Sequence, residues 1–315
     1  MTVAAVLLAY SFCAGMTGSR LLVRARWTVR APLLAMVTYL AAAWSVVAAL
    51  ALAGLTLAVH ATALGGGLSH LIGACVLRLR DTYATPGGAT AAGIGLALAG
   101  GVAAHATVTA VTHLRAVRRQ ALRHAQAARL VGRPQPDLGA LLVDHAQPAA
   151  YCVAGPHPTV IVTTGALRAL DPHQVEAVLA HERAHLARRH HRFLAVARIG
   201  RQMFPFIPLM RDTAAQMARL VEMDADDAAA SGRDTRTLAT ALVVLATPAS
   251  PVPALAASAT DTVQRIQRLL GPAEPLSRVR RHLLRAGAAV LAVTPVLLAL
   301  TPAVVALALG RVPAA

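Results

Sequence analysis

Two histidines and a glutamate near the middle of the chain have the spacing of a metal-binding helix. The residues read His181-Glu182-Arg183-Ala184-His185. Side chains four residues apart share one face of an α-helix, so both imidazoles can bind the same zinc ion. Glu182 would lie beside the zinc-activated water and is predicted to accept its proton as the catalytic base of a peptidase. Because the chain contains only four glutamates, chance is a poor explanation for this pattern.

A catalytic zinc site needs a third protein ligand, for which Glu222 is our candidate. Glu222 lies 37 residues beyond His185, which is far enough for a following helix to fold back. Asp226, one helical turn further on, is expected to accept a hydrogen bond from a ligand histidine and to fix its tautomer. The alternative is that the acidic residues 222–227 form a solvated face. Three further histidines are assigned to the surface or to helix ends: His173, His190 and His191.

The residues around the motif predict a strand pair and two helices. Residues 151–154 and 159–163 are short runs of β-forming residues separated by a Gly-Pro-His-Pro turn. The sequence Asp171-Pro172-His173-Gln174 supplies an N-cap, a first-turn proline and a capping-box partner, so a helix is expected over about 172–190. A second helix is predicted over 211–230, with Gly232 as its stop.

The predicted strand at 159–163 directly precedes the motif helix. An edge strand at this place would hold an extended substrate by backbone pairing, which needs little side-chain specificity. We therefore assign Val160, Ile161 and Val162 to substrate binding. Proline at residue 160 or 161 is expected to damage cleavage more than zinc content.

The rest of the chain is apolar enough to cross a membrane, since 56% of all residues are hydrophobic. Uncharged runs at about 2–19, 31–59, 87–112 and 286–310 are each close to or above the length of roughly 20 residues that a spanning helix needs. The basic segment 113–131 is expected to continue the third span as a helix that ends at Gly132. The predicted fold is a mostly α polytopic membrane protein with an α+β zincin-like domain between spans three and four.

The arginines decide the orientation of these four spans. They cluster between spans one and two, directly after span three and directly before span four. Basic residues near span ends favour the cytosolic side. We therefore expect an amino terminus outside the plasma membrane, a cytosolic domain over 113–285 and a short outside tail over 311–315.

The composition argues against two other classes of function. The net charge is +16 and all basic residues are arginines, but aromatic residues make up only 3% of the chain. Because single-strand binders interleave basic and aromatic side chains, no direct binding to nucleic acid is expected. The widely spaced Cys13, Cys75 and Cys152 predict neither a disulfide framework nor a cysteine zinc site.

Residues 150–230 resemble the BlaR/MecR-type membrane metallopeptidases, family fifty-six of the metallopeptidases. The likeness lies in Ala150-Tyr151-Cys152-Val153, Thr159-Val160-Ile161-Val162, Leu179-Ala180-His181-Glu182-Arg183-Ala184-His185 and Glu222-Met223-Asp224-Ala225-Asp226. The plan of four spans around a protease domain is also similar. The resemblance implies a gluzincin in which His181, His185 and Glu222 hold one Zn²⁺ ion and Glu182 is catalytic.

In the antibiotic sensors of that group, a penicillin-binding domain follows the fourth span, and the protease brings about loss of a DNA-bound repressor. This chain stops at Ala315, so a signal is expected to come through the spans, the 60–89 loop or an unknown sensor partner. The predicted function is a membrane endopeptidase that cleaves a cytosolic or membrane protein in regulated proteolysis, with a transcriptional repressor as one candidate substrate.

Two alternatives stay open. The HtpX-type membrane proteases share the H-E-x-x-H and E-x-x-x-D patterns, and resemblance to them implies a housekeeping role in protein quality control. A catalytically silent receptor or scaffold is the other alternative, although a scaffold would have no use for Glu182.

Overall fold

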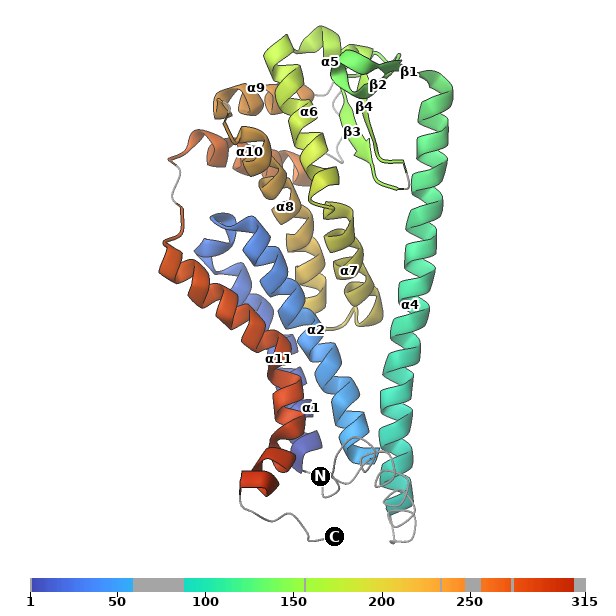
Figure 1. The fold of residues 1–315 in the computed structure, drawn as a ribbon, viewed down its shortest axis with the longest axis vertical. Coiled ribbons are helices and arrows are strands. Elements are labelled where there is room, and N and C mark those ends of the chain that lie inside the picture. Colours follow the sequence, from blue (N-terminus) through green and yellow to red (C-terminus); the bar gives the residue numbers. More distant parts are fainter. Residues whose placement is uncertain are drawn as a thin grey trace.

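The computed structural model describes residues 2–58, 88–155, 157–232, 234–246, 256–272 and 275–308. Almost all of the 60–89 loop and the whole of the tail at 311–315 therefore lie outside the described residues. Long helices form one end of the molecule, and a helical domain with a small sheet forms the other (Figure 1).

Four of the described helices are long and apolar enough to cross a membrane. They are α1 (Thr2–Val23), α2 (Pro32–Ala58), α4 (Gly88–Val131) and α11 (Arg278–Ala308). The short helix η1 (Arg26–Val29) connects α1 and α2. Helix α4 runs unbroken for 44 residues, so the expected continuation of the third apolar run through the basic segment to Gly132 is confirmed.

A sheet of four short strands covers one end of the helical domain. The strands are β1 (Gly132–Gln135), β2 (Ala140–Val143), β3 (Ala150–Val153) and β4 (Thr159–Thr163), and their order is β1-β2-β4-β3. Helix η2 (Pro136–Leu138) joins β1 to β2. Strands β3 and β4 form the predicted antiparallel pair, while β2 lies parallel to β4. The sequence analysis did not predict β1 or β2.

Strand β4 is an interior strand, so its assignment as a substrate-binding edge is wrong. Strand β2 pairs with one side of β4 and β3 pairs with the other. Since neighbouring strands use both sides of its backbone, β4 cannot pair with a substrate through Val160, Ile161 and Val162. These three side chains are buried in the core. The sheet edge beside the motif helix belongs to β3 instead.

Between the sheet and α11, the described residues form six helices: α5 (Thr164–Ala169), α6 (Pro172–Ala187), α7 (His190–Met203), α8 (Pro208–Ala230), α9 (Thr235–Ala246) and α10 (Ala256–Leu270). The capping box between Asp171 and Gln174 begins α6 as predicted. The helix ends about one turn earlier than expected, because Arg189 adopts a left-handed conformation with φ 55°. A separate helix, α7, therefore starts at His190.

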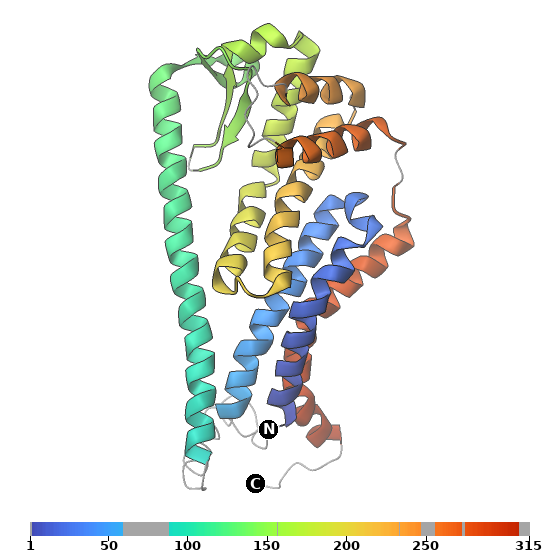
Figure 2. The same ribbon diagram turned by 180° about the vertical axis from the view of Figure 1, so that it is seen from behind.

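Helices α7 and α8 form an antiparallel hairpin that packs among the long apolar helices (Figures 1 and 2). Helix α8 contacts α1 and α2, and α7 contacts α4. At Gly15 of α1, an added Cβ atom would come within 3.0 Å of Cγ2 of Ile207, so only glycine allows this approach without movement of the neighbour. The hairpin thereby connects the predicted catalytic domain to the long apolar helices.

Candidate active site

The structure brings together all three residues that were predicted to bind zinc. Nε2 of His181 lies 3.0 Å from Nε2 of His185. The carboxylate oxygens of Glu222 lie 3.4 Å from Nε2 of His181 and 3.5 Å from Nε2 of His185. Ligands bonded to tetrahedral zinc at about 2.0–2.1 Å lie about 3.3 Å from one another. Two imidazole nitrogens and one carboxylate at these distances fit a zinc ion in both chemistry and spacing.

Asp226 lies where the sequence predicted it, behind the first histidine. Its Oδ1 atom is 3.0 Å from Nδ1 of His181, and its side chain is buried. Arg265 of α10 donates two hydrogen bonds, of 2.8 Å and 2.7 Å, to the same carboxylate and lies 2.9 Å from Glu222. The carboxylate favours a proton on Nδ1 of His181, which leaves Nε2 free to bind a metal.

The second histidine has a corresponding partner in His190. Nδ1 of His190 lies 2.9 Å from Nδ1 of His185, and its Nε2 lies 2.9 Å from a carboxylate oxygen of Asp224. Arg188 donates a hydrogen bond of 2.6 Å to the other oxygen of Asp224. Because the carboxylate only accepts, His190 donates from Nε2 and accepts at Nδ1 from His185. Nε2 of His185 is therefore also free for a metal.

These contacts correct the surface assignment of His190 and exclude the alternative given for residues 222–227. His190 begins a helix, but it is 1% exposed and does not lie on the surface. Asp224 and Asp226 are 3% and 0% exposed, so the acidic segment is not a solvated face.

The sequence analysis missed His190, Asp224 and Arg265. His190 follows His185 by five residues, so on one continuous helix it would not share the face of His185. Only the break at Arg189 turns it back toward the site. Asp224 was visible within the acidic segment, whereas Arg265 comes from a separate helix and no local pattern connects it to Glu222.

Residues 113–273, just over half of the chain, match the family model described as Peptidase family M48. The chain belongs to peptidase family M48. Members of this family are zinc metallopeptidases, in agreement with the ligand set of the site. No curated protein and no solved structure matches the chain.

The environment of Glu182 suits a general base in this M48 peptidase. Burial raises the pKa of its carboxyl group, and the opposing effect of His181 is smaller. Cys152 of β3 lies beside Glu182, and burial together with that carboxylate raises the pKa of the thiol to about 12. Cys152 is therefore a neutral thiol at physiological pH. A base is most effective when its pKa approaches the working pH, so the shift of Glu182 is in the useful direction.

The two histidines of this M48 site differ in their protonation without a bound metal. Burial opposes a charge on His181, but the carboxylates of Asp226 and Glu222 outweigh it and raise its pKa to about 9. Burial lowers the pKa of His185 to about 4. Since zinc binds only the deprotonated imidazole, a metal must displace a proton from His181 at neutral pH.

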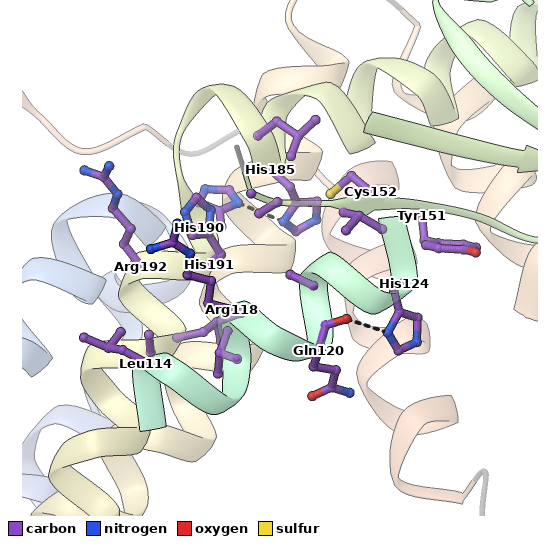
Figure 3. A pocket seen from close by; sticks show the side chains of 18 of the residues that line it. Leu114, Arg118, Gln120, His124, Tyr151, Cys152, His185, His190, His191 and Arg192 are labelled. Atoms are coloured by element: carbon purple, nitrogen blue, oxygen red, sulfur yellow. Dashed lines mark hydrogen bonds between the residues drawn. The ribbon is translucent and has the colours of Figure 1, made fainter. Parts of the chain in front are cut away.

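A cavity of about 850 Å³ adjoins the M48 site on the side of α4. Figure 3 shows His185 and Cys152 at one part of its wall and His124 and Arg118 of α4 at another. Helix α7 contributes the remaining wall, with Leu194 among its residues. The cavity therefore joins the candidate metal site and the edge strand β3 to the helix that leaves the third apolar run.

Proposed function

We propose that this M48 protein is an integral-membrane zinc endopeptidase with its catalytic domain in the cytosol. The observation that carries the proposal is the meeting of two imidazole Nε2 atoms and the Glu222 carboxylate beside Glu182. The four long apolar helices support the placement in a bilayer.

The protein's own groups account for the steps of peptide hydrolysis. His181, His185 and Glu222 would hold one zinc ion, which when bound supplies a Lewis acid that acidifies water and polarises the scissile carbonyl. Glu182 accepts the proton of the attacking water and delivers it to the leaving amine. The free edge of β3 supports an extended substrate by backbone pairing, the role first assigned to β4.

We further propose regulated proteolysis as the biological role, with one cytosolic or membrane protein as substrate and a transcriptional repressor as a candidate. The resemblance of residues 150–230 to the BlaR/MecR-type proteases and the four-helix plan support this finer assignment. Housekeeping proteolysis of the HtpX type is the competing proposal, supported by the shared H-E-x-x-H and E-x-x-x-D patterns. A silent scaffold is disfavoured because Glu182 is retained beside a complete set of metal ligands.

The assigned roles are tested by measuring zinc content and casein cleavage of the detergent-purified protein. Wild type is expected to hold about one zinc ion per chain and to cleave. Glu182→Gln should keep zinc and lose cleavage, whereas Glu222→Ala should lose zinc. Glu176→Gln, an exposed change on the same helix, is the matched control and should behave as wild type. Full zinc content in Glu222→Ala would disprove the third ligand, and metal-free wild type would disprove the peptidase proposal.

The regulated and housekeeping roles are separated by their substrates. Membrane and cytosolic proteins that accumulate in cells expressing Glu182→Gln are compared with those in cells expressing wild type. A single stabilised protein, cut at one site, supports regulated proteolysis. Accumulation of many unrelated membrane proteins supports the housekeeping role instead.

A further inference from the structure

The turn of the α7–α8 hairpin lies among the apolar parts of the long helices. At this turn, Nε2 of His105 on α4 donates a hydrogen bond of 3.1 Å to the carbonyl oxygen of Met203. Ile207 packs against Gly15 of α1, and Leu209 packs against Gly18. The same apolar cluster includes residues from the middle of α2, namely Val46, Val47 and Leu50. Residues 203–210 themselves carry no charge.

The position of this turn fixes the depth of the metal site. Gly15, Val46 and His105 all belong to the uncharged runs of their helices, so in a bilayer the turn lies within the hydrocarbon layer. Leu209 and Glu222 are 13 residues apart on α8, which is about 20 Å along the helix. Gly15 lies four residues before its uncharged run ends at Ser19, and His105 lies seven residues before Thr112, so the turn is about 6–10 Å inside the cytosolic edge of the hydrocarbon layer. The metal ligands therefore lie about 10–14 Å beyond that edge, at the outer side of the lipid headgroups.

The cavity beside His185 extends from near the edge of the hydrocarbon layer to the metal ligands. Its α4 wall begins at Leu114, two residues after the uncharged run ends at Thr112. Most of the lining is apolar, and its fully charged side chains are Arg118 and Arg192, with no acidic residue among them. At its inner end the cavity reaches His185 and the free edge of β3 (Figure 3).

We propose that this cavity receives the cytosolic end of a substrate's transmembrane segment, so that the enzyme cuts membrane proteins a few residues from the bilayer. The inference rests on the proposed function and adds the substrate class. An apolar segment that leaves the bilayer in extended form fits the cavity wall and can continue along the edge of β3. Arg118 and Arg192 repel Arg and Lys, so the preferred substrate lacks the basic cluster that often ends a span.

The first test uses full-length protein in vesicles of phosphatidylethanolamine and phosphatidylglycerol. Two single-span substrates carry the same apolar cleavage segment, about 3 or about 25 extended residues beyond the span. The near segment should be cut at least about tenfold faster, which corresponds to about 1.4 kcal/mol. Equal cleavage of both, or cleavage of casein alone, would overturn the inference and leave the proposed function intact. If neither substrate nor casein is cut, both fail.

The second test asks whether the cavity holds the substrate. Val117→Trp fills the cavity, whereas Ala116→Trp changes the neighbouring exposed position outside its lining. Val117→Trp should lower the ratio of near-segment to casein cleavage by about tenfold, and Ala116→Trp should not. An unchanged ratio in a folded Val117→Trp protein would contradict the proposal.

Cross-linking keeps the proposal testable if Val117→Trp fails to fold. A benzophenone side chain at position 114, in the Glu182→Gln background, should cross-link to the near-segment substrate. The same group at position 116 should not. Absence of the cross-link from position 114, or an equal yield from position 116, would overturn the inference.

Discussion

At the scale of single residues, each candidate zinc histidine has its own partner at Nδ1. Nδ1 of His181 contacts the carboxylate of Asp226, and Nδ1 of His185 contacts Nδ1 of His190. An arginine neutralises the charge of each buried carboxylate, since Arg265 binds Asp226 and Arg188 binds Asp224. A buried carboxylate without a partner would cost about 3–5 kcal/mol, so these pairs keep both supports in place. These partners favour the tautomers in which Nε2 of each histidine is free for a metal at the candidate site.

The role of His190 predicts a loss of metal affinity when its side chain is removed. In His190→Ala, His185 loses the acceptor that orients its ring, and zinc affinity should fall by about 10- to 100-fold. The measurement is competition with a chelator of known affinity. His173→Ala, an exposed change near the start of α6, serves as control and should bind zinc as wild type does. Equal affinity of the two variants would remove His190 from the site.

Zinc binding should release protons in an amount that depends on Asp226. With its pKa raised to about 9, His181 is protonated at pH 7 and must lose that proton to bind the metal. Wild type should therefore release about one proton per zinc ion at pH 7, and zinc affinity should fall as the pH is lowered. Asp226→Asn removes a carboxylate that raises the pKa of His181, so less proton should be released. Calorimetry in buffers of different ionisation enthalpy measures the difference, and an unchanged release would refute this account.

At the scale of elements, the sequence predicted those helices and strands whose ends are set by neighbouring residues. The capping box at Asp171 begins α6, and the two β-forming runs became β3 and β4. Strand β2 was not predicted. Because β2 pairs with β4, the edge strand beside the motif helix is β3 and not β4. Arg265 also needed tertiary information, because α10 meets α8 only after the chain has folded back. The sequence therefore predicted the three residues that meet at the candidate metal site, but not most of the groups that contact them.

The break between α6 and α7 predicts how residue 189 tolerates substitution. The left-handed conformation at φ 55° is easy for glycine and costly for a β-branched side chain. Arg189→Gly should keep or slightly raise the melting temperature, whereas Arg189→Val should destabilise the protein by about 1–2 kcal/mol. Because the break aims His190 at His185, Arg189→Val should also lower zinc affinity. Thermal unfolding with and without zinc measures both effects, and equal stability of the two variants would contradict the assigned conformation.

At the scale of the whole molecule, charge and fold agree on one orientation. The carboxyl end of α1 and the amino ends of α2 and α11 lie on the side of the catalytic domain (Figures 1 and 2). The arginines next to the spans gather at these ends and after the apolar run of α4. Since arginine near span ends favours the cytosolic side, the arrangement supports a cytosolic catalytic domain. In this orientation, arginines at the cytosolic ends of the apolar helices account for part of the net charge of +16.

This orientation predicts which positions react with an impermeant thiol reagent. In a background where Cys13, Cys75 and Cys152 are replaced by serine, a single cysteine is placed at Thr2 or at Ala116. Thr2→Cys should be labelled in intact cells, because α1 begins at the end opposite the sheet. Ala116→Cys, beyond the apolar run of α4, should be labelled only after the membrane is permeabilised. The reverse pattern would place the catalytic domain outside the cell and exclude cytosolic proteins as substrates, even if the zinc chemistry of the site is as proposed.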